Sequence, residues 1–145
     1  KLYHKTLMIK LLYLNKQTRC IIASMYKMTL LFQKPEDPDH FEDQWSQTFI
    51  PFAEQMPGLQ RITVCHVEGE PDGQSNYYRI HEFQFADKTA LDYALSSEKG
   101  VRAGNALMGF AGDITTILFS ESFEETRNME LDQKINNGNA AVQQR

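Results

Sequence analysis

The sequence predicts an α+β fold of the ferredoxin-like type, a four-stranded antiparallel sheet with its helices on one face. Two observations predict it. Alternating apolar residues mark a strand near each end of the central region and a pair of strands in its middle. Two helix-spaced stretches separate that pair from the outer strands. The order is therefore β-α-β-β-α-β, and two right-handed crossovers around a central hairpin give this arrangement.

The first strand is predicted at residues 25–33, MYKMTLLFQ, because apolar and other residues alternate there. The residues on its strongly apolar side are Tyr26, Met28, Leu30 and Phe32. A helix should follow, because Asp37 is a good N-cap. Pro38 suits the first helical position, where a backbone N–H would have no partner within the helix.

The first helix carries one apolar stripe and a proline within it. The stripe residues recur at steps of three and four: Phe41, Trp45, Phe49, Phe52 and Met56. Pro51 cannot donate to the carbonyl of Gln47 and crowds it. We therefore expect the helix to kink, or to pause and resume, around 47–51, and to end at Pro57 and Gly58.

The central hairpin is predicted from the β-rich stretches 59–70 and 76–85 and the turn signal Pro-Asp-Gly between them. If Asp72 and Gly73 form a two-residue turn, Pro71 faces Gln74. In the same register His66 faces Arg79 and Val64 faces His81. One sheet face would then carry Tyr77, Arg79, His81 and His66. A slip of one residue would move His66 to the other face.

The second helical region is predicted to begin after Asp87, to be interrupted at Ser96 and Ser97, and to continue to Phe110. Gly112 is expected as the C′ residue. Gly104, Gly109 and Gly112 are too sparse for a phosphate-binding loop and are expected at close-packing positions and a helix end. Residues 113–124 form the last strand.

The 145 residues are predicted to form one domain at residues 25–125. Residues 1–24 are expected to be an extension outside the fold, and residues 126–145 a polar tail. Residues 25–125 hold seven basic and seventeen acidic residues, a net charge of −10, which disfavours nucleic acid. No stretch approaches the ~18 uncharged apolar residues of a membrane helix. Two cysteines without a disulfide framework indicate a cytoplasmic protein.

The stretch FEDQWSQTFIPFAEQMPGL resembles the first-helix signature of the EthD family, named for a component of an ethyl tert-butyl ether degradation system. The matching residues are Phe41, Trp45, Thr48, Pro51, Ala53, Pro57, Gly58 and Leu59. EGEPDGQSNYYRIHEFQFAD and SSEKGVRAGNALMGFAG are similar too, so the resemblance covers about residues 25–122. It implies the dimeric α+β barrel fold. A homodimer also follows from the outward-facing Leu31, Tyr78 and Ile80, which a second copy would cover.

The resemblance places Phe49 where the family commonly carries histidine, and phenylalanine cannot transfer a proton. The remaining acid or base candidates are His81 and His66, with Arg79 and Tyr77 orienting an anionic or phenolic substrate. Further residues expected to bind a small molecule are Trp45, Phe49, Phe52, Asn105 and Met108. Two histidines on adjacent strands lack a third ligand, so no metal is expected. The same face could equally be a hydrogen-bonded strand surface without chemistry.

Two classes of function remain. The resemblance implies proteins that family naming calls reductases, but no nicotinamide or flavin fingerprint is present, so no cofactor is expected. Cofactor-independent isomerase, cyclase or decarboxylase chemistry fits a pocket of His, Tyr and Arg better. The alternative is a non-catalytic protein that binds a hydrophobic or aromatic metabolite between helices and sheet. The replacement of the family histidine by Phe49 favours this alternative.

Overall fold

The computed structural model describes residues 22–125. The chain divides into two units, and Ser24–Ser122 is the unit that carries the fold. The other unit consists of both ends of the chain, Lys1–Ala23 and Phe123–Arg145. Of the predicted N-terminal extension, residues 22–24 belong to the first strand, Ile22–Gln33, so the fold begins three residues earlier than predicted. Residues 1–21 and the predicted C-terminal tail lie outside the described residues.

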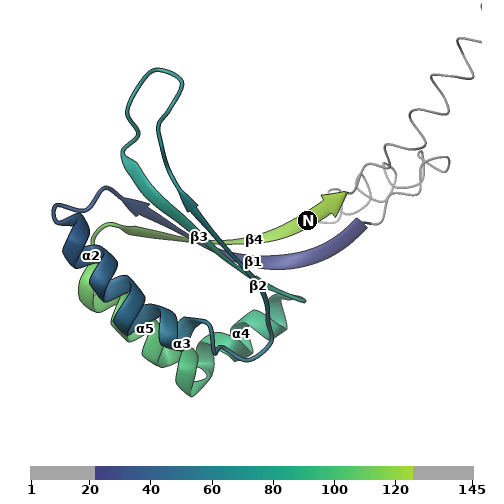
Figure 1. Cartoon of the computed structure of the whole chain (residues 1–145). Coiled ribbons are helices and arrows are strands. Elements are labelled where there is room, and N and C mark those ends of the chain that lie inside the picture. Colours follow the sequence, from purple (N-terminus) through teal and green to yellow (C-terminus); the bar gives the residue numbers. More distant parts are fainter. Residues whose placement is uncertain (1–21, 126–145) are drawn as a thin grey trace, which may run out of the picture. The chain divides into compact units, whose positions relative to one another are not determined.

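Four strands form one sheet in the predicted ferredoxin-like arrangement, with the helices on one side of it (Figure 1). The strands are β1 (Ile22–Gln33), β2 (Leu59–His66), β3 (Tyr77–Phe85) and β4 (Thr115–Glu125), in the order β2-β3-β1-β4. Strand β3 is antiparallel to both β1 and β2. Gln33 bonds to Ile114 at one end of β1 and Ser24 to Glu121 at the other, so β4 is antiparallel too.

Two of the helices begin where the sequence predicts N-caps, after Asp37 and Asp87. The helices are α2 (Pro38–Gln44), the π-helical turn η1 (Trp45–Phe49), α3 (Ile50–Ala53), α4 (Lys88–Ser96) and α5 (Glu98–Ala111). Carboxylates of Asp37 and Asp87 accept backbone N–H bonds of 3.0 and 2.8 Å at the starts of α2 and α4. The hydroxyl of Ser97, where an interruption was predicted, accepts the Gly100 N–H and so caps α5. Within residues 22–125, no helix is long and apolar enough to cross a membrane.

Pro51 explains the π-helical turn. A proline at this position cannot donate to the carbonyl of Gln47. The helical turn instead takes in one more residue, and the Ile50 N–H donates to the carbonyl of Trp45. Pro51 then stands in the first turn of α3, where its missing N–H costs little. The predicted pause and resumption of the helix is confirmed, and π-helical turns of this kind are frequent at functional sites.

A β-bulge interrupts the pairing of β3 with β1. Phe32 pairs with Arg79, whereas Gln33 pairs with Tyr77, so Tyr78 and Arg79 together lie opposite one residue of β1. A bulge of this kind breaks the alternation of side chains and re-aims them. Here it lets two consecutive side chains reach the helical layer.

The bulge corrects two predicted orientations. Tyr78, expected on the outward face, donates a 2.7 Å hydrogen bond to Glu42 of α2, as does Arg79 Nη2. Tyr77, expected on the inward face, is 43% exposed. Strict alternation predicted the reverse because it cannot anticipate an extra residue in one strand.

The hairpin turn also differs from the prediction. Glu70 bridges Gly73, so Pro71 and Asp72 form the turn and Pro71 does not face Gln74. Three residues separate His66 from Glu70, whereas five separate Gly73 from Arg79, so the second arm of the hairpin holds two extra residues between these pairs. The predicted register within the strands is nevertheless confirmed: His66 pairs with Arg79, and Val64 with His81.

The core lies between the helices and the inner sheet face. Its largest fully buried side chains are Phe32, Phe49, Phe83, Phe85, Leu30, Leu91 and His81. Gly112 ends α5 with φ −62°, so it is not the left-handed C′ residue that we predicted. Glycine is needed because a Cβ would lie 2.9 Å from the carbonyl oxygen of Met108. Gly104 and Gly109 face open space rather than close-packed neighbours.

Candidate functional site

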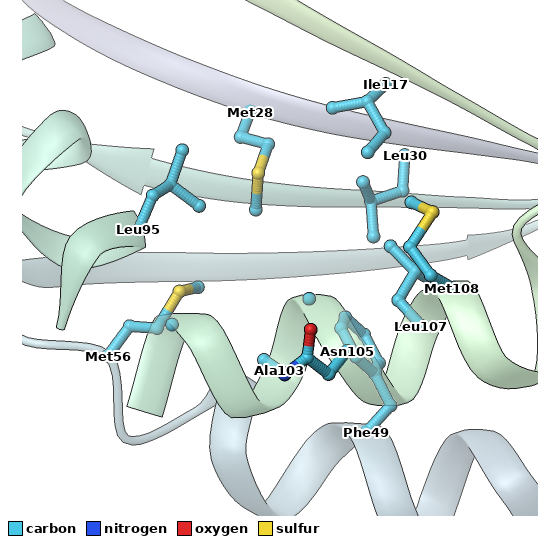
Figure 2. Close-up of a pocket in the computed structure, with 12 residues that line it drawn as sticks. Met28, Leu30, Phe49, Met56, Leu95, Ala103, Asn105, Leu107, Met108 and Ile117 are labelled. Carbon is cyan, nitrogen blue, oxygen red and sulfur yellow. The ribbon is translucent and has the colours of Figure 1, made fainter. Parts of the chain in front are cut away.

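A cleft of about 190 Å³ opens between α5, the Phe49 end of η1, and strands β1 and β4 (Figure 2). Its lining residues are Met28, Leu30, Phe49, Met56, Leu95, Gly100, Ala103, Gly104, Asn105, Leu107, Met108 and Ile117. Among these described residues Asn105 has the only polar side chain. The cleft is therefore an apolar site with a single neutral hydrogen-bonding group.

Strands β1 and β4 and helix α5 supply most of this lining. Met28 and Leu30 alternate on β1 so that both point toward the helices, and Ile117 approaches from β4 (Figure 2). Ala103 and Leu107 are one turn apart on α5 and are both buried. Between them Gly104 has nothing within 4 Å of where a Cβ would stand. The missing side chain at Gly104 thus helps to keep the cleft open.

Phe49 forms the inner wall of the cleft and is 2% exposed, as predicted. Its ring also meets the rings of His81 and Phe83 edge-on, with centroid distances of 6.0 and 6.1 Å. His81 does not line the cleft. The Phe49 ring therefore stands between the apolar cleft and the histidine.

Behind Phe49 lies a group of three residues, Trp45, Arg79 and His81, which we call the polar cluster. The Arg79 guanidinium carbon is 4.2 Å from the centre of the Trp45 ring, and the Trp45 and His81 ring centroids are 5.7 Å apart. Arg79 Nη2 lies 2.7 Å from Glu42 Oε1. The cluster is thus contiguous and is joined to α2 by one ion pair.

Burial sets the protonation of His81. The pKa of its imidazole is lowered to about 4, chiefly by burial and secondarily by the positive charge of Arg79. His81 is therefore neutral at pH 7 and a weak base. The pKa of Tyr78 is raised, first by its hydrogen bond to Glu42 and then by burial, so its hydroxyl stays protonated as a donor.

The structure separates the predicted site residues. Asn105 and Met108 line the cleft with Phe49. Phe52 lies outside the lining, under the guanidinium of Arg102 at 4.1 Å. His66 is exposed, with its ring edge-on to Tyr78. In residues 22–125 no three His, Cys, Asp or Glu side chains are grouped so that they could hold a metal ion.

Sequence reasoning missed Glu42 and Ile117. Arg79 was expected on this face, but Tyr78 reaches Glu42 because of the bulge, which leaves no signal in the sequence. Ile117 belongs to an alternating strand, but its contribution to the cleft depends on which way β4 faces. Met28 and Leu30 could have been found, because they lie on the predicted apolar side of the first strand.

Comparison with known proteins identifies the family. No family model matches the chain. A solved EthD family protein from Bacillus halodurans is 31% identical, with a TM-score of 0.66, over 68% of this chain and 98% of that one. The chain belongs to the EthD family. The predicted resemblance is thereby confirmed.

Two further proteins are similar. The chain is 26% identical over 102 residues to an uncharacterized 11.0 kDa protein in the thcB–thcC intergenic region of Rhodococcus erythropolis, covering 70% of this chain and 97% of that protein. A dimeric ferredoxin-like protein of unknown function from Jannaschia is 20% identical with a TM-score of 0.51, over 68% of this chain and 99% of that one. The second likeness supports the fold of this EthD-family chain.

Proposed function

We propose that this EthD-family protein binds a small apolar metabolite, about the size of one substituted aromatic ring, in the cleft beside α5. The observation that carries the proposal is the apolar lining, in which Asn105 is the only polar side chain among the described residues. A dry apolar cavity of about 150 Å³ is large enough for benzene, and this cleft is of similar size at about 190 Å³.

Binding without catalysis is the reading that we favour over isomerase, cyclase or reductase chemistry. No described residue of the cleft lining titrates near neutral pH or could act as a nucleophile. His81 stands behind the Phe49 ring, and its low pKa makes it a weak base. The aromatic ring of Phe49 adds apolar surface to the cleft at the position where the family resemblance places a histidine.

The protein is further proposed to be a homodimer through the sheet face opposite the helices. Ile117 lines the cleft, so Leu118, next along β4, points to that opposite face and is 47% exposed. Leu31 and Ile80 pair on the same face and are half-buried. The Jannaschia protein of this fold is described as dimeric. A second copy would cover this apolar surface.

Ethylbenzene is a suitable probe of the cleft, with binding followed by NMR of ¹³C-labelled methionine methyl groups. Three of the six methionines, Met28, Met56 and Met108, line the cleft and serve as reporters. We expect their signals to move saturably while the other methionine signals stay in place. Gly104→Leu would fill the cleft and should weaken binding at least about tenfold.

Gly109→Leu is the matched control, because Gly109 also lies in α5 with nothing within 4 Å of its missing Cβ but does not line the cleft. It should leave the affinity for ethylbenzene unchanged. Equal weakening by both variants, or saturable shifts of all the methionine signals alike, would contradict binding in the cleft.

A further inference from the structure

The polar cluster contains buried donors that nothing in the described protein uses. His81 is 0% exposed and Arg79 is 8% exposed. Trp45 Nε1, Arg79 Nε, Arg79 Nη1 and both ring nitrogens of His81 are buried and have no hydrogen-bond partner among the described residues. Buried polar atoms are nearly always bonded, so such a concentration indicates a site for a further group.

The chemistry of these atoms defines that group. Indole and guanidinium nitrogens only donate hydrogen bonds, and a neutral imidazole donates from one nitrogen and accepts at the other. Donors therefore outnumber acceptors in the polar cluster. The missing partner must supply acceptor oxygens.

The charges of the polar cluster narrow the chemical class of the ligand. Arg79 is already neutralised by Glu42, whose carboxylate oxygen lies 2.7 Å from Nη2. The ion pair and the neutral His81 together carry no net charge. A carboxylate or phosphate would leave a net negative charge in a largely desolvated place, which is unfavourable. An uncharged acceptor, such as the carbonyl oxygen of a ketone, ester or lactone, takes the same donors without that penalty.

Exposed side chains lie next to the polar cluster at the edge of the sheet. Strand β2 is the edge strand, and its Val64 and His66 lie directly opposite His81 and Arg79. Val64 is 44% exposed, His66 is exposed and Trp45 is half-buried. The apolar part of a ligand can therefore lie against Val64 and the Trp45 ring while its oxygen points inward.

From this arrangement we infer that Trp45, Arg79 and His81 form a second ligand site, separate from the apolar cleft, which binds an uncharged carbonyl compound by its oxygen. Phe49 separates the two sites. The inference does not depend on ligand binding in the cleft, because none of the three cluster residues lines the cleft.

The single tryptophan of the chain makes a direct test possible, because its indole Nε1–H gives one resolved NMR signal. The probes are acetophenone, benzoate and ethylbenzene, which share a benzene ring and differ in the presence and charge of the oxygen group. Acetophenone should move the indole proton downfield saturably, as hydrogen bonding does, and ethylbenzene should not. Benzoate should bind at least about tenfold more weakly than acetophenone.

Variants separate the two sites and supply the controls. Gly104→Leu, which blocks the cleft, should leave the acetophenone-induced indole shift unchanged. Arg79→Gln should weaken acetophenone binding about tenfold or more, as expected for lost charge-assisted hydrogen bonds. Arg102→Gln is the matched control, because Arg102 also lies over an aromatic ring, 4.1 Å from the centre of Phe52, but is exposed. Arg102→Gln should leave the affinity for acetophenone unchanged.

A second variant covers the case in which Arg79→Gln unfolds the protein. Trp45→Phe keeps an aromatic ring without the donor, and acetophenone binding to it is read from the Arg79 Nε–H signal, with an expected loss of affinity of about tenfold. The inference is overturned if ethylbenzene moves the indole proton as acetophenone does, if benzoate binds more tightly, or if none of the probes causes a saturable shift.

Discussion

Replacing Phe49 by alanine and by histidine tests whether this side chain is an ordinary core residue or the wall of a site that tolerates polarity. Phe49 is 2% exposed and its ring meets His81 and Phe83 edge-on. Phe49→Ala removes these contacts and leaves a void continuous with the cleft. Buried Phe-to-Ala changes cost about 3–5 kcal/mol, and we expect a loss of unfolding free energy in this range.

Phe49→His should cost less, about 1–3 kcal/mol. Imidazole fills most of the volume of the benzene ring, so the cavity contribution is small. A buried ring nitrogen without a partner costs about 1–3 kcal/mol. Both ring nitrogens of His81 are without a hydrogen bond, and its ring centroid lies 6.0 Å from that of Phe49. A hydrogen bond between an imidazole at position 49 and His81 can therefore recover part of that loss.

Urea denaturation of the two variants and the native chain, all at one chain concentration, measures both losses. With a slope of about 1–3 kcal/mol per molar, a loss of 3–5 kcal/mol lowers the midpoint by roughly 2 M. A histidine variant clearly less stable than the alanine variant would refute this reasoning. The surroundings of Phe49 would then be a dry core, and His81 would not be an available hydrogen-bond partner.

Three further predictions follow from the structure. The pKa of His81 is about 4 in the folded chain against 6.5 ordinarily, so the unfolded chain binds more protons between these values. The contribution of His81 to the free energy of unfolding is fully present above pH 6.5. It should fall by up to about 3 kcal/mol as the pH drops to 4. The stability of His81→Leu, measured by urea denaturation across this range, should lack that part of the pH dependence; parallel curves would contradict it. Light scattering at micromolar concentration should give about twice the 16.7 kDa chain mass, and Leu118→Lys should reduce it to one chain. A native chain that stays monomeric across a dilution series excludes the dimer. Removing residues 1–21, which precede β1, should change the melting temperature by only a few degrees, and a loss of ~3 kcal/mol or more would mean that they pack on the fold.

The sequence by itself determined the order of the elements, the helix caps at Asp37 and Asp87 and the disturbance at Pro51. These features depend on residues close together in the chain. Strand alternation, helical spacing and the missing N–H of proline act within a few residues, so each leaves a readable pattern.

Only the tertiary structure decided how the candidate site is divided. The bulge opposite Phe32 exchanges the expected roles of Tyr77 and Tyr78, and it arises from a mismatch between two strands far apart in sequence. The cleft depends on how α5 lies beside β1 and β4, which are far apart in the sequence, and Phe49 stands between His81 and the cleft. Packing between distant segments sets these outcomes, and the free-energy differences between alternative packings do not appear in local sequence patterns.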